Sequence, residues 1–117
     1  MPPRIHQIVP QLIHQIVHQL VPRRFLTADR SMEPTLVDGQ GLIGVQWGRP
    51  AVGQLRTFEH PDRAGFWLVK RVTAVSGDSM IVESDNPHVG AVDSHHFGPV
   101  NVAGSYRIVV RVPRRWM

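Results

Sequence analysis

From Phe25 onward, the sequence consists of short apolar runs that Gly, Pro, Asp and Asn interrupt every few residues. Runs of this length with turn residues between them are typical of β-strands. The predicted strands cover residues 42–45, 53–58, 66–75, 80–83 and 106–112. Because several short strands follow one another without a helical pattern between them, we expect residues 25–117 to form a mainly β domain, a small partly closed barrel or folded sheet.

Residues 1–24 follow a different pattern and are expected to form an amphipathic helix. Their apolar residues recur at three- and four-residue spacing, at Ile5, Ile8, Val9, Leu12, Ile13, Ile16, Val17 and Leu20. Gln and His interrupt the segment throughout, so it has no apolar run of ~20 residues that could span a bilayer. Pro10 is expected to kink the helix or to lie in its first turn, and Pro22 to end it. Residues 22–24 are the expected linker.

Two environments are open for this helix. Its apolar face can lie in a membrane interface over residues 4–20, with Arg4, Arg23 and Arg24 near anionic head groups. It can instead pack on the β domain or on a partner helix, which is the commoner arrangement of such a face. The first interpretation predicts a peripheral membrane protein, and the second allows a cytoplasmic one.

The composition narrows the chemistry of the chain. There is no Cys, which excludes disulfides, thiolate metal sites and a cysteine nucleophile. His14 and His18 lie four residues apart without a third ligand nearby, so we expect no metal and no other cofactor. A net charge of +4 is too small to indicate nucleic acid binding. Lys70 is the single lysine among thirteen Lys and Arg residues, and lysine can lose its proton far more readily than arginine.

The predicted strand around Lys70 favours a neutral amine. Alternate residues of a strand share one face, and those on the face of Lys70 are all apolar: Phe66, Leu68, Val72 and Ala74. An exposed lysine has a pKa of about 10.4, and lowering it by about 3 units costs about 4 kcal/mol. Burial among apolar side chains can impose this cost. Lys70 is therefore a candidate general base.

The segment from Ser31 to Leu36, Ser-Met-Glu-Pro-Thr-Leu, resembles the nucleophile box of the type I signal peptidase family. The similarity continues in the same order, roughly over residues 25–113, through Lys70-Arg71-Val72, Gly77-Asp78, Asp85-Asn86-Pro87, Asp93-Ser94 and Phe97-Gly98-Pro99-Val100. This resemblance implies a serine endopeptidase that removes an N-terminal signal or propeptide by cleaving after small residues. Ser31 would be the nucleophile, and Lys70 would be its general base.

The resemblance also implies roles for neighbouring residues. The oxyanion hole would include the backbone N–H of Ser31, and Asp93 and Ser94 would support the catalytic pair. The substrate would be an extended peptide that adds as a strand between residues 25–30 and residues 67–70. The residues expected to shape its subsites are Leu26, Thr27, Met32, Leu36 and Val69. For Met32 and Leu36, core packing is an equally good explanation.

The chain departs from the family pattern near both ends of the motif series. Asp29 stands two residues before Ser31, where relatives have a hydroxyl residue or glycine, and an ionised carboxylate cannot donate a hydrogen bond to an oxyanion. The Gly90-Ala91-Val92 segment lacks the serine whose hydroxyl holds the lysine in relatives, and His95 replaces an arginine. Ser84 and Ser94 are both candidates to supply that hydroxyl.

Three interpretations of the function follow. The first is a general signal peptidase. The second is a dedicated maturation protease for a single substrate such as nickel superoxide dismutase, because short relatives that lack a large inserted domain include proteases of that kind. The third is a peptide-binding module with weak or no catalysis, which Asp29 and the altered segment before Asp93 favour. The related self-cleaving repressors carry a DNA-binding domain, and residues 1–24 cannot form a helix-turn-helix.

Overall fold

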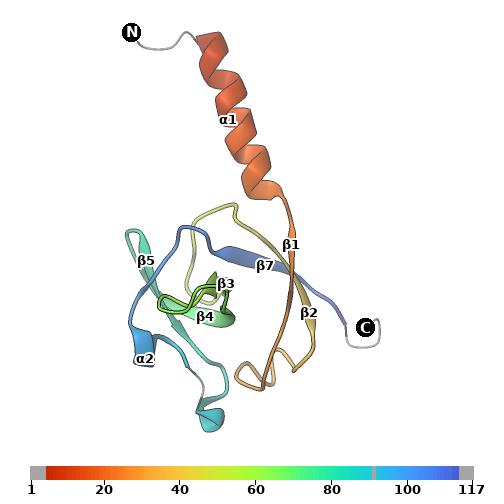
Figure 1. Ribbon diagram of the computed structural model, residues 1–117, viewed down its shortest axis with the longest axis vertical. Helices are drawn as coiled ribbons and strands as arrows, with labels where there is room; N and C mark the ends of the chain where they lie inside the picture. Colours follow the sequence, from red (N-terminus) through yellow and green to blue (C-terminus); the bar gives the residue numbers. More distant parts are fainter. Residues whose placement is uncertain (1–4, 91, 114–117) are drawn as a thin grey trace.

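The computed structural model describes residues 5–90 and 92–113, which form one long helix followed by a mainly antiparallel β domain (Figure 1). The long helix α1 spans Ile5–Leu20. The seven strands are β1 (Arg23–Leu26), β2 (Gly41–Val45), β3 (Leu55–Glu59), β4 (Trp67–Ser76), β5 (Ser79–Glu83), β6 (Val100–Asn101) and β7 (Tyr106–Arg111). Two single-turn helices, η1 (Pro87–Val89) and α2 (Ser94–Phe97), lie between β5 and β6.

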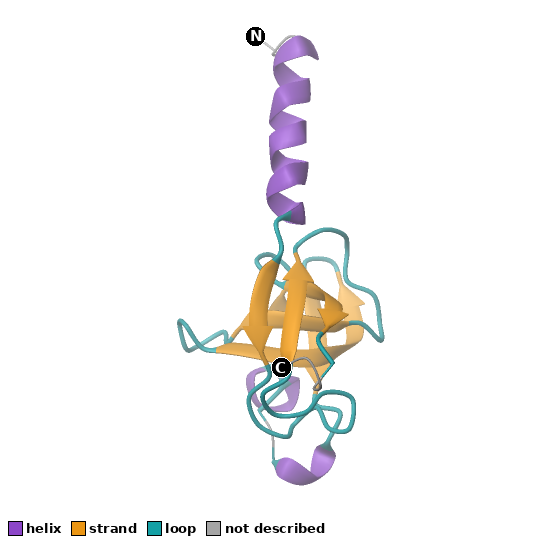
Figure 2. Cartoon of the chain, turned by 90° about the vertical axis from the view of Figure 1, so that its right-hand side faces the viewer, coloured by secondary structure: helices purple, strands orange, loops and turns teal. Residues whose placement is uncertain are grey.

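All seven strands belong to one sheet, in the order β1-β2-β7-β3-β4-β5-β6, and every neighbouring pair is antiparallel. The sheet curls on itself but is not closed, because β1 and β6 each pair with only one strand (Figure 2). This arrangement confirms the predicted mainly β class. The five predicted strands correspond to β2, β3, β4, β5 and β7, with bounds that differ by one or two residues.

The first strand is a feature that the sequence pattern did not predict. Arg23 and Arg24 pair with Gly44 and Ile43 of β2, so only Val21 and Pro22 separate α1 from the sheet. A four-residue strand that begins with two exposed arginines has too little alternation of apolar and polar residues to be recognised from sequence. The two-residue strand β6 and the single-turn helices are too short to give a periodic pattern.

Two clusters of buried side chains hold the β domain together. One contains Phe58, Val72, Met80, Val82 and Val100, and the other contains Met32, Leu36, Leu42 and Leu55. Met32 and Leu36 lie in the loop that follows β1 and are completely buried. Burial of each of these side chains stabilises the fold by about 1.5–3 kcal/mol, which anchors the loop that begins at Ser31.

Helix α1 projects away from the β domain (Figures 1 and 2). Pro10 lies inside the helix, Pro22 follows its end, and the backbone N–H of Gln46 donates to the carbonyl of Gln19 at 3.0 Å. The described apolar side chains of its C-terminal half are 41–56% exposed, namely those of Leu12, Ile13, Ile16, Val17 and Leu20. This exposure contradicts the interpretation that this half packs on its own domain.

The membrane interface and a partner helix therefore remain for the exposed face of α1. Arg4, which was expected near lipid head groups, lies outside the described residues, as does Ala91 of the altered segment. Within residues 5–90 and 92–113, no helix combines the length and the apolar character that crossing a membrane requires.

Candidate active site

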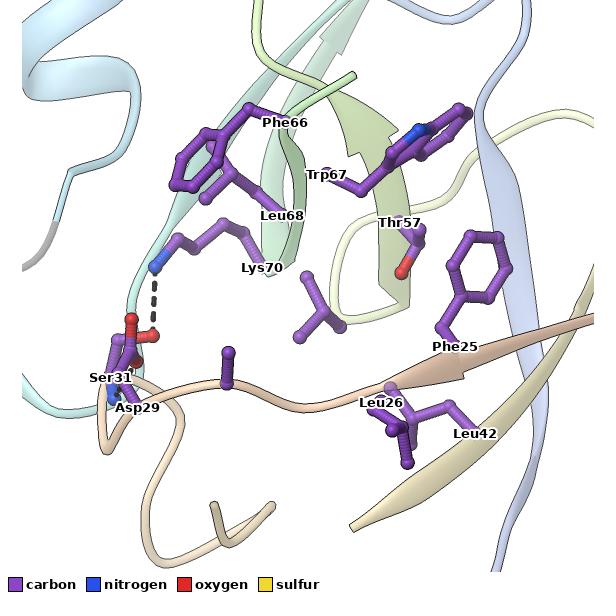
Figure 3. A pocket seen from close by; sticks show the side chains of 12 residues that line it. Phe25, Leu26, Asp29, Ser31, Leu42, Thr57, Phe66, Trp67, Leu68 and Lys70 are labelled. Atoms are coloured by element: carbon purple, nitrogen blue, oxygen red, sulfur yellow. Dashed lines mark hydrogen bonds between the residues drawn. The ribbon is translucent and has the colours of Figure 1, made fainter. Parts of the chain in front are cut away.

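The fold brings Ser31 and Lys70 into contact. Ser31 lies in the turn after β1, and Lys70 projects from β4 (Figure 3). The Nζ atom of Lys70 is 2.9 Å from the Oγ atom of Ser31, which is hydrogen-bond distance. Only 2% of Lys70 and 4% of Ser31 are exposed. The two residues that the sequence singled out as nucleophile and base therefore meet in a site that excludes most water.

Burial lowers the pKa of the Lys70 amine below its ordinary value. Loss of hydration disfavours the ammonium form, whereas the negative charges of Asp29 and Asp93 oppose the shift and raise the pKa. The loss of hydration is the larger influence. The amine is therefore easier to deprotonate here than in water, as a general base requires.

A second hydrogen bond fixes the direction of the Lys70 amine. Its Nζ atom donates to Ser84 Oγ at 3.0 Å, whereas Ser94 Oγ accepts from the backbone N–H of Val82 at 2.9 Å. Of the two candidate hydroxyls, Ser84 is thus the one at the lysine. Asp93 supports the Lys70 amine indirectly, through Ser84: its Oδ2 atom accepts a hydrogen bond from the backbone N–H of Ser84 at 3.0 Å.

Asp93 also begins the helix α2. Its Oδ1 atom accepts the backbone N–H of His95 at 2.9 Å, as an N-cap does. Burial raises the pKa of Asp93, but the two backbone hydrogen bonds and the charges of His95 and Lys70 outweigh this and lower it overall. The His95 side chain pairs directly with Glu83, since its Nε2 atom lies 3.1 Å from Glu83 Oε1. The imidazole nearest to Asp93 is instead that of His96, whose Nδ1 atom lies 3.9 Å from Oδ1.

The segment after β5 is hydrogen-bonded to the loop that contains Ser31. The backbone N–H of Asn86 donates to the Ser31 carbonyl at 2.8 Å, and its side-chain amide donates to the Arg30 carbonyl at 3.1 Å. Asp85 accepts two hydrogen bonds from Arg71, at 2.9 and 2.7 Å. The sequence placed Asp85-Asn86-Pro87 in the series of family-like motifs but indicated no role for these residues. Their contacts with the Ser31 loop depend on chain pairing that no local pattern reveals.

The carboxylate of Asp29 accepts a hydrogen bond from the backbone N–H of Ser31, the group that was expected to stabilise an oxyanion. Its Oδ1 atom lies 2.7 Å from the Ser31 nitrogen (Figure 3). The backbone N–H of Asp29 itself donates to Asp38 Oδ1 at 2.9 Å. Asp29 has a φ of 73°, in the left-handed region that glycine adopts most readily and Asp only occasionally. The Asp29 carboxylate thus lies directly beside Ser31.

A cavity of about 180 Å³ extends from the Ser31–Lys70 pair along β1 and β4 (Figure 3). Two of the five expected subsite residues, Leu26 and Val69, line it, and Thr57 contributes a buried hydroxyl without a hydrogen-bond partner among the described residues. The other three expected subsite residues do not line this cavity: Thr27, Met32 and Leu36. Thr27 is buried, and Met32 and Leu36 are fully used in the second core cluster.

The strands beside the cavity leave backbone groups available for a further strand. β1 pairs only with β2, and β4 pairs with β5 only from Arg71 onward, so residues 67–70 have one unpaired edge. Unpaired strand edges are templates for the addition of an extended peptide. For a metal, by contrast, the described residues offer no cluster of three or more His, Asp or Glu side chains.

Comparison with protein families gives one match: the model described as signal peptidase, peptidase S26, aligns with residues 5–92. The aligned range contains both Ser31 and Lys70 and ends just before Asp93. Neither the curated proteins nor the solved structures gave a significant match to this chain.

Proposed function

The chain belongs to the signal peptidase family, peptidase S26, and from this premise we propose that it is a serine endopeptidase with a Ser31–Lys70 dyad. The observation that carries the proposal is the 2.9 Å contact between Lys70 Nζ and Ser31 Oγ, in which both residues are almost completely buried. A serine hydroxyl is a weak nucleophile until a nearby base accepts its proton. Lys70 is the base within reach, and burial lowers its pKa.

In the proposed reaction, neutral Lys70 accepts the Ser31 proton while Oγ bonds to the carbonyl carbon of the substrate. The resulting ammonium then donates its proton to the leaving amine as the peptide C–N bond breaks, which leaves an acyl-enzyme on Ser31. Lys70, neutral again, accepts a proton from water while the water oxygen bonds to the acyl carbonyl carbon, and the ammonium then returns a proton to Ser31 Oγ as the ester bond breaks and the acid is released. Ser84 keeps the amine directed at Ser31 through both halves of the reaction.

The proposed substrate is an extended segment of a pre-protein or pro-protein. The unpaired edges of β1 and of residues 67–70 support this, because a peptide between them would gain backbone hydrogen bonds on both sides. The small cavity beside the dyad supports cleavage after small residues. A single propeptide as substrate, such as that of nickel superoxide dismutase, is the narrower version of this proposal.

Covalent trapping tests the nucleophile. The chain is mixed with a peptide that carries small residues before the scissile bond, quenched with acid within milliseconds to seconds, and weighed intact. We expect the wild type to gain the mass of the N-terminal peptide fragment, with the ester on Ser31. Ser31→Ala should show neither adduct nor cleavage, and Ser94→Ala should show both, because Ser94 bonds to the Val82 N–H and not to Lys70.

Two results would contradict the proposal. Cleavage that persists in Ser31→Ala would exclude Ser31 as the nucleophile. Tight binding of presequence peptides without cleavage by the wild type would favour a peptide-binding module, the alternative to which the Asp29–Ser31 contact points.

For the location of the protein we propose peripheral attachment to a membrane through α1, with a cytoplasmic protein as the alternative. The exposed apolar face of Leu12–Leu20 supports an interfacial helix. Both arginines that follow it are exposed, and the guanidinium of Arg23 also lies 4.4 Å from the ring centroid of Trp67. Both can therefore face lipid head groups, with Arg23 held against the domain at Trp67.

Vesicle binding tests this location. Ile13→Glu should weaken co-sedimentation with phosphatidylglycerol vesicles about 10- to 100-fold, because one buried aliphatic side chain contributes roughly 1.5–3 kcal/mol. His18→Glu adds the same charge on the polar face of the same helix and should weaken binding much less. Equal binding by both variants, or a stable dimer in solution that Ile13→Glu dissociates, would favour a partner helix instead.

A further inference from the structure

Arg56 is a buried cation that the proposed catalysis does not use. Its side chain lies on β3 and is completely buried, with an exposed fraction of 0%. Its Nε atom donates to Ser105 Oγ at 2.9 Å, and Nη2 lies 3.4 Å from the Ser105 carbonyl. Nη1 has no hydrogen-bond partner, and no carboxylate of the described residues pairs with this guanidinium.

The neighbours of Arg56 make its charge less favourable still. On the adjacent strands it stands opposite Lys70 and Arg107, which are both basic. Burial and the charge of Arg107 together lower the pKa of Arg56. A buried charge is strongly destabilising unless it is paired, and neutral oxygens of a single serine compensate it only in part.

A cavity of about 570 Å³ lies beside this guanidinium. It is lined by Arg56, the exposed Arg49, Gln19 and Gln46, among others. The described residues around it include no Asp or Glu. The loops that form it, residues 46–49 and 102–105, lie at the end of the sheet from which α1 departs (Figure 1).

We propose that this cavity binds a phosphate group, with Arg56 and Arg49 as its cationic ligands. A phosphate offers several acceptor oxygens on one centre, so it can accept from Nη1 of Arg56 and from a second guanidinium at once. The two glutamine amides add neutral donors at the mouth. Because Nη1 is covered, binding includes a shift of the flanking loops. The phosphate comes either from a lipid head group, which α1 would bring to the mouth near Gln19, or from solution.

Thermal unfolding of the full chain tests the site and distinguishes the sources. One arm compares sodium phosphate with sodium chloride at equal pH and ionic strength. The other compares short-chain phosphatidylglycerol, below its micelle concentration, with the matching diacylglycerol. We expect a saturable rise in Tm of roughly 3–6 °C with a phosphate compound. A rise in the lipid arm alone assigns the site to head groups. A rise with inorganic phosphate assigns it to free phosphate, and no rise in either arm overturns the proposal.

The variants separate a binding role from a structural one. Arg56→Met should abolish the phosphate-dependent rise, and its Tm in chloride should equal or exceed that of the wild type, because an unpaired buried charge is gone. Arg63→Met removes an arginine that stacks on Phe66 elsewhere and should keep the rise. A lower Tm of Arg56→Met in every buffer, with the rise intact, would assign Arg56 to structure alone.

If Arg56→Met does not fold, Arg49→Gln provides the test. The proposal requires that the phosphate concentration needed for the rise in Tm increases at least about tenfold in this variant, and an unchanged concentration overturns it.

Discussion

Replacement of Lys70 by Met or by Arg is expected to reduce kcat/KM for peptide cleavage by about 10³–10⁴-fold, toward the upper end of what general bases contribute. Methionine keeps much of the length and apolar stem of lysine but cannot accept a proton. Arginine keeps the positive charge and the donors facing Ser31 and Ser84, yet its guanidinium does not deprotonate in this pH range. Steady-state cleavage of one peptide by the three proteins measures the effect, with circular dichroism to confirm that each variant is folded.

The pair of variants separates proton transfer from electrostatic support. If Lys70→Arg retained activity while Lys70→Met lost it, Lys70 would act through its charge, and the proposed base would be wrong. The pH dependence of the wild type gives a second check. Only the neutral amine can accept the Ser31 proton, so kcat/KM should rise with pH through the lowered pKa of Lys70 and level off above it.

The burial of this lysine could be predicted from the sequence because it depends on a local pattern. Alternation along the strand places Lys70 between Leu68 and Val72, and the structure buries it there. A register shift between Val72 and Ala74 nevertheless interrupts the alternation and leaves Ala74 exposed. The partner of its amine could not be predicted in the same way. Ser84 and Ser94 are equally plausible in the sequence, and only the pairing of β4 with β5 brings Ser84 to Nζ while α2 directs Ser94 to Val82.

Two other features depend on long-range packing and were outside the reach of sequence patterns. The amphipathic period predicted α1, but a period cannot say what covers the apolar face, and the structure leaves its described part, from Leu12 to Leu20, exposed. Met32 and Leu36 fit equally well in a subsite or in the core, and the second core cluster needs both of them. At position 29, the sequence indicated a missing donor but not that the carboxylate would accept the N–H of Ser31.

The Asp29–Ser31 contact leads to the second large prediction: Asp29→Gly should raise kcat/KM about 10- to 100-fold. In the wild type, the backbone N–H of Ser31 must leave the carboxylate at 2.7 Å before it can donate to an oxyanion. A hydrogen bond to a charged group is worth roughly 1.5–3 kcal/mol, which corresponds to that range of rates. Glycine removes this bond, and it accepts the φ of 73° without strain.

The comparison of Asp29→Gly with Asp29→Asn divides the effect into its two causes. Asparagine loses the charge but keeps an oxygen that can accept the Ser31 N–H, so its gain in rate should be smaller than that of glycine. The negative charge of Asp29 raises the pKa of Lys70, so both variants should lower that pKa further and move the rising limb of the pH profile to lower pH. Glu33→Gln, which removes a carboxylate paired with Arg30, should leave rate and profile unchanged. If Asp29→Gly were slower than the wild type, with the limb in its original place, the carboxylate would assist the reaction and would not obstruct the oxyanion donor.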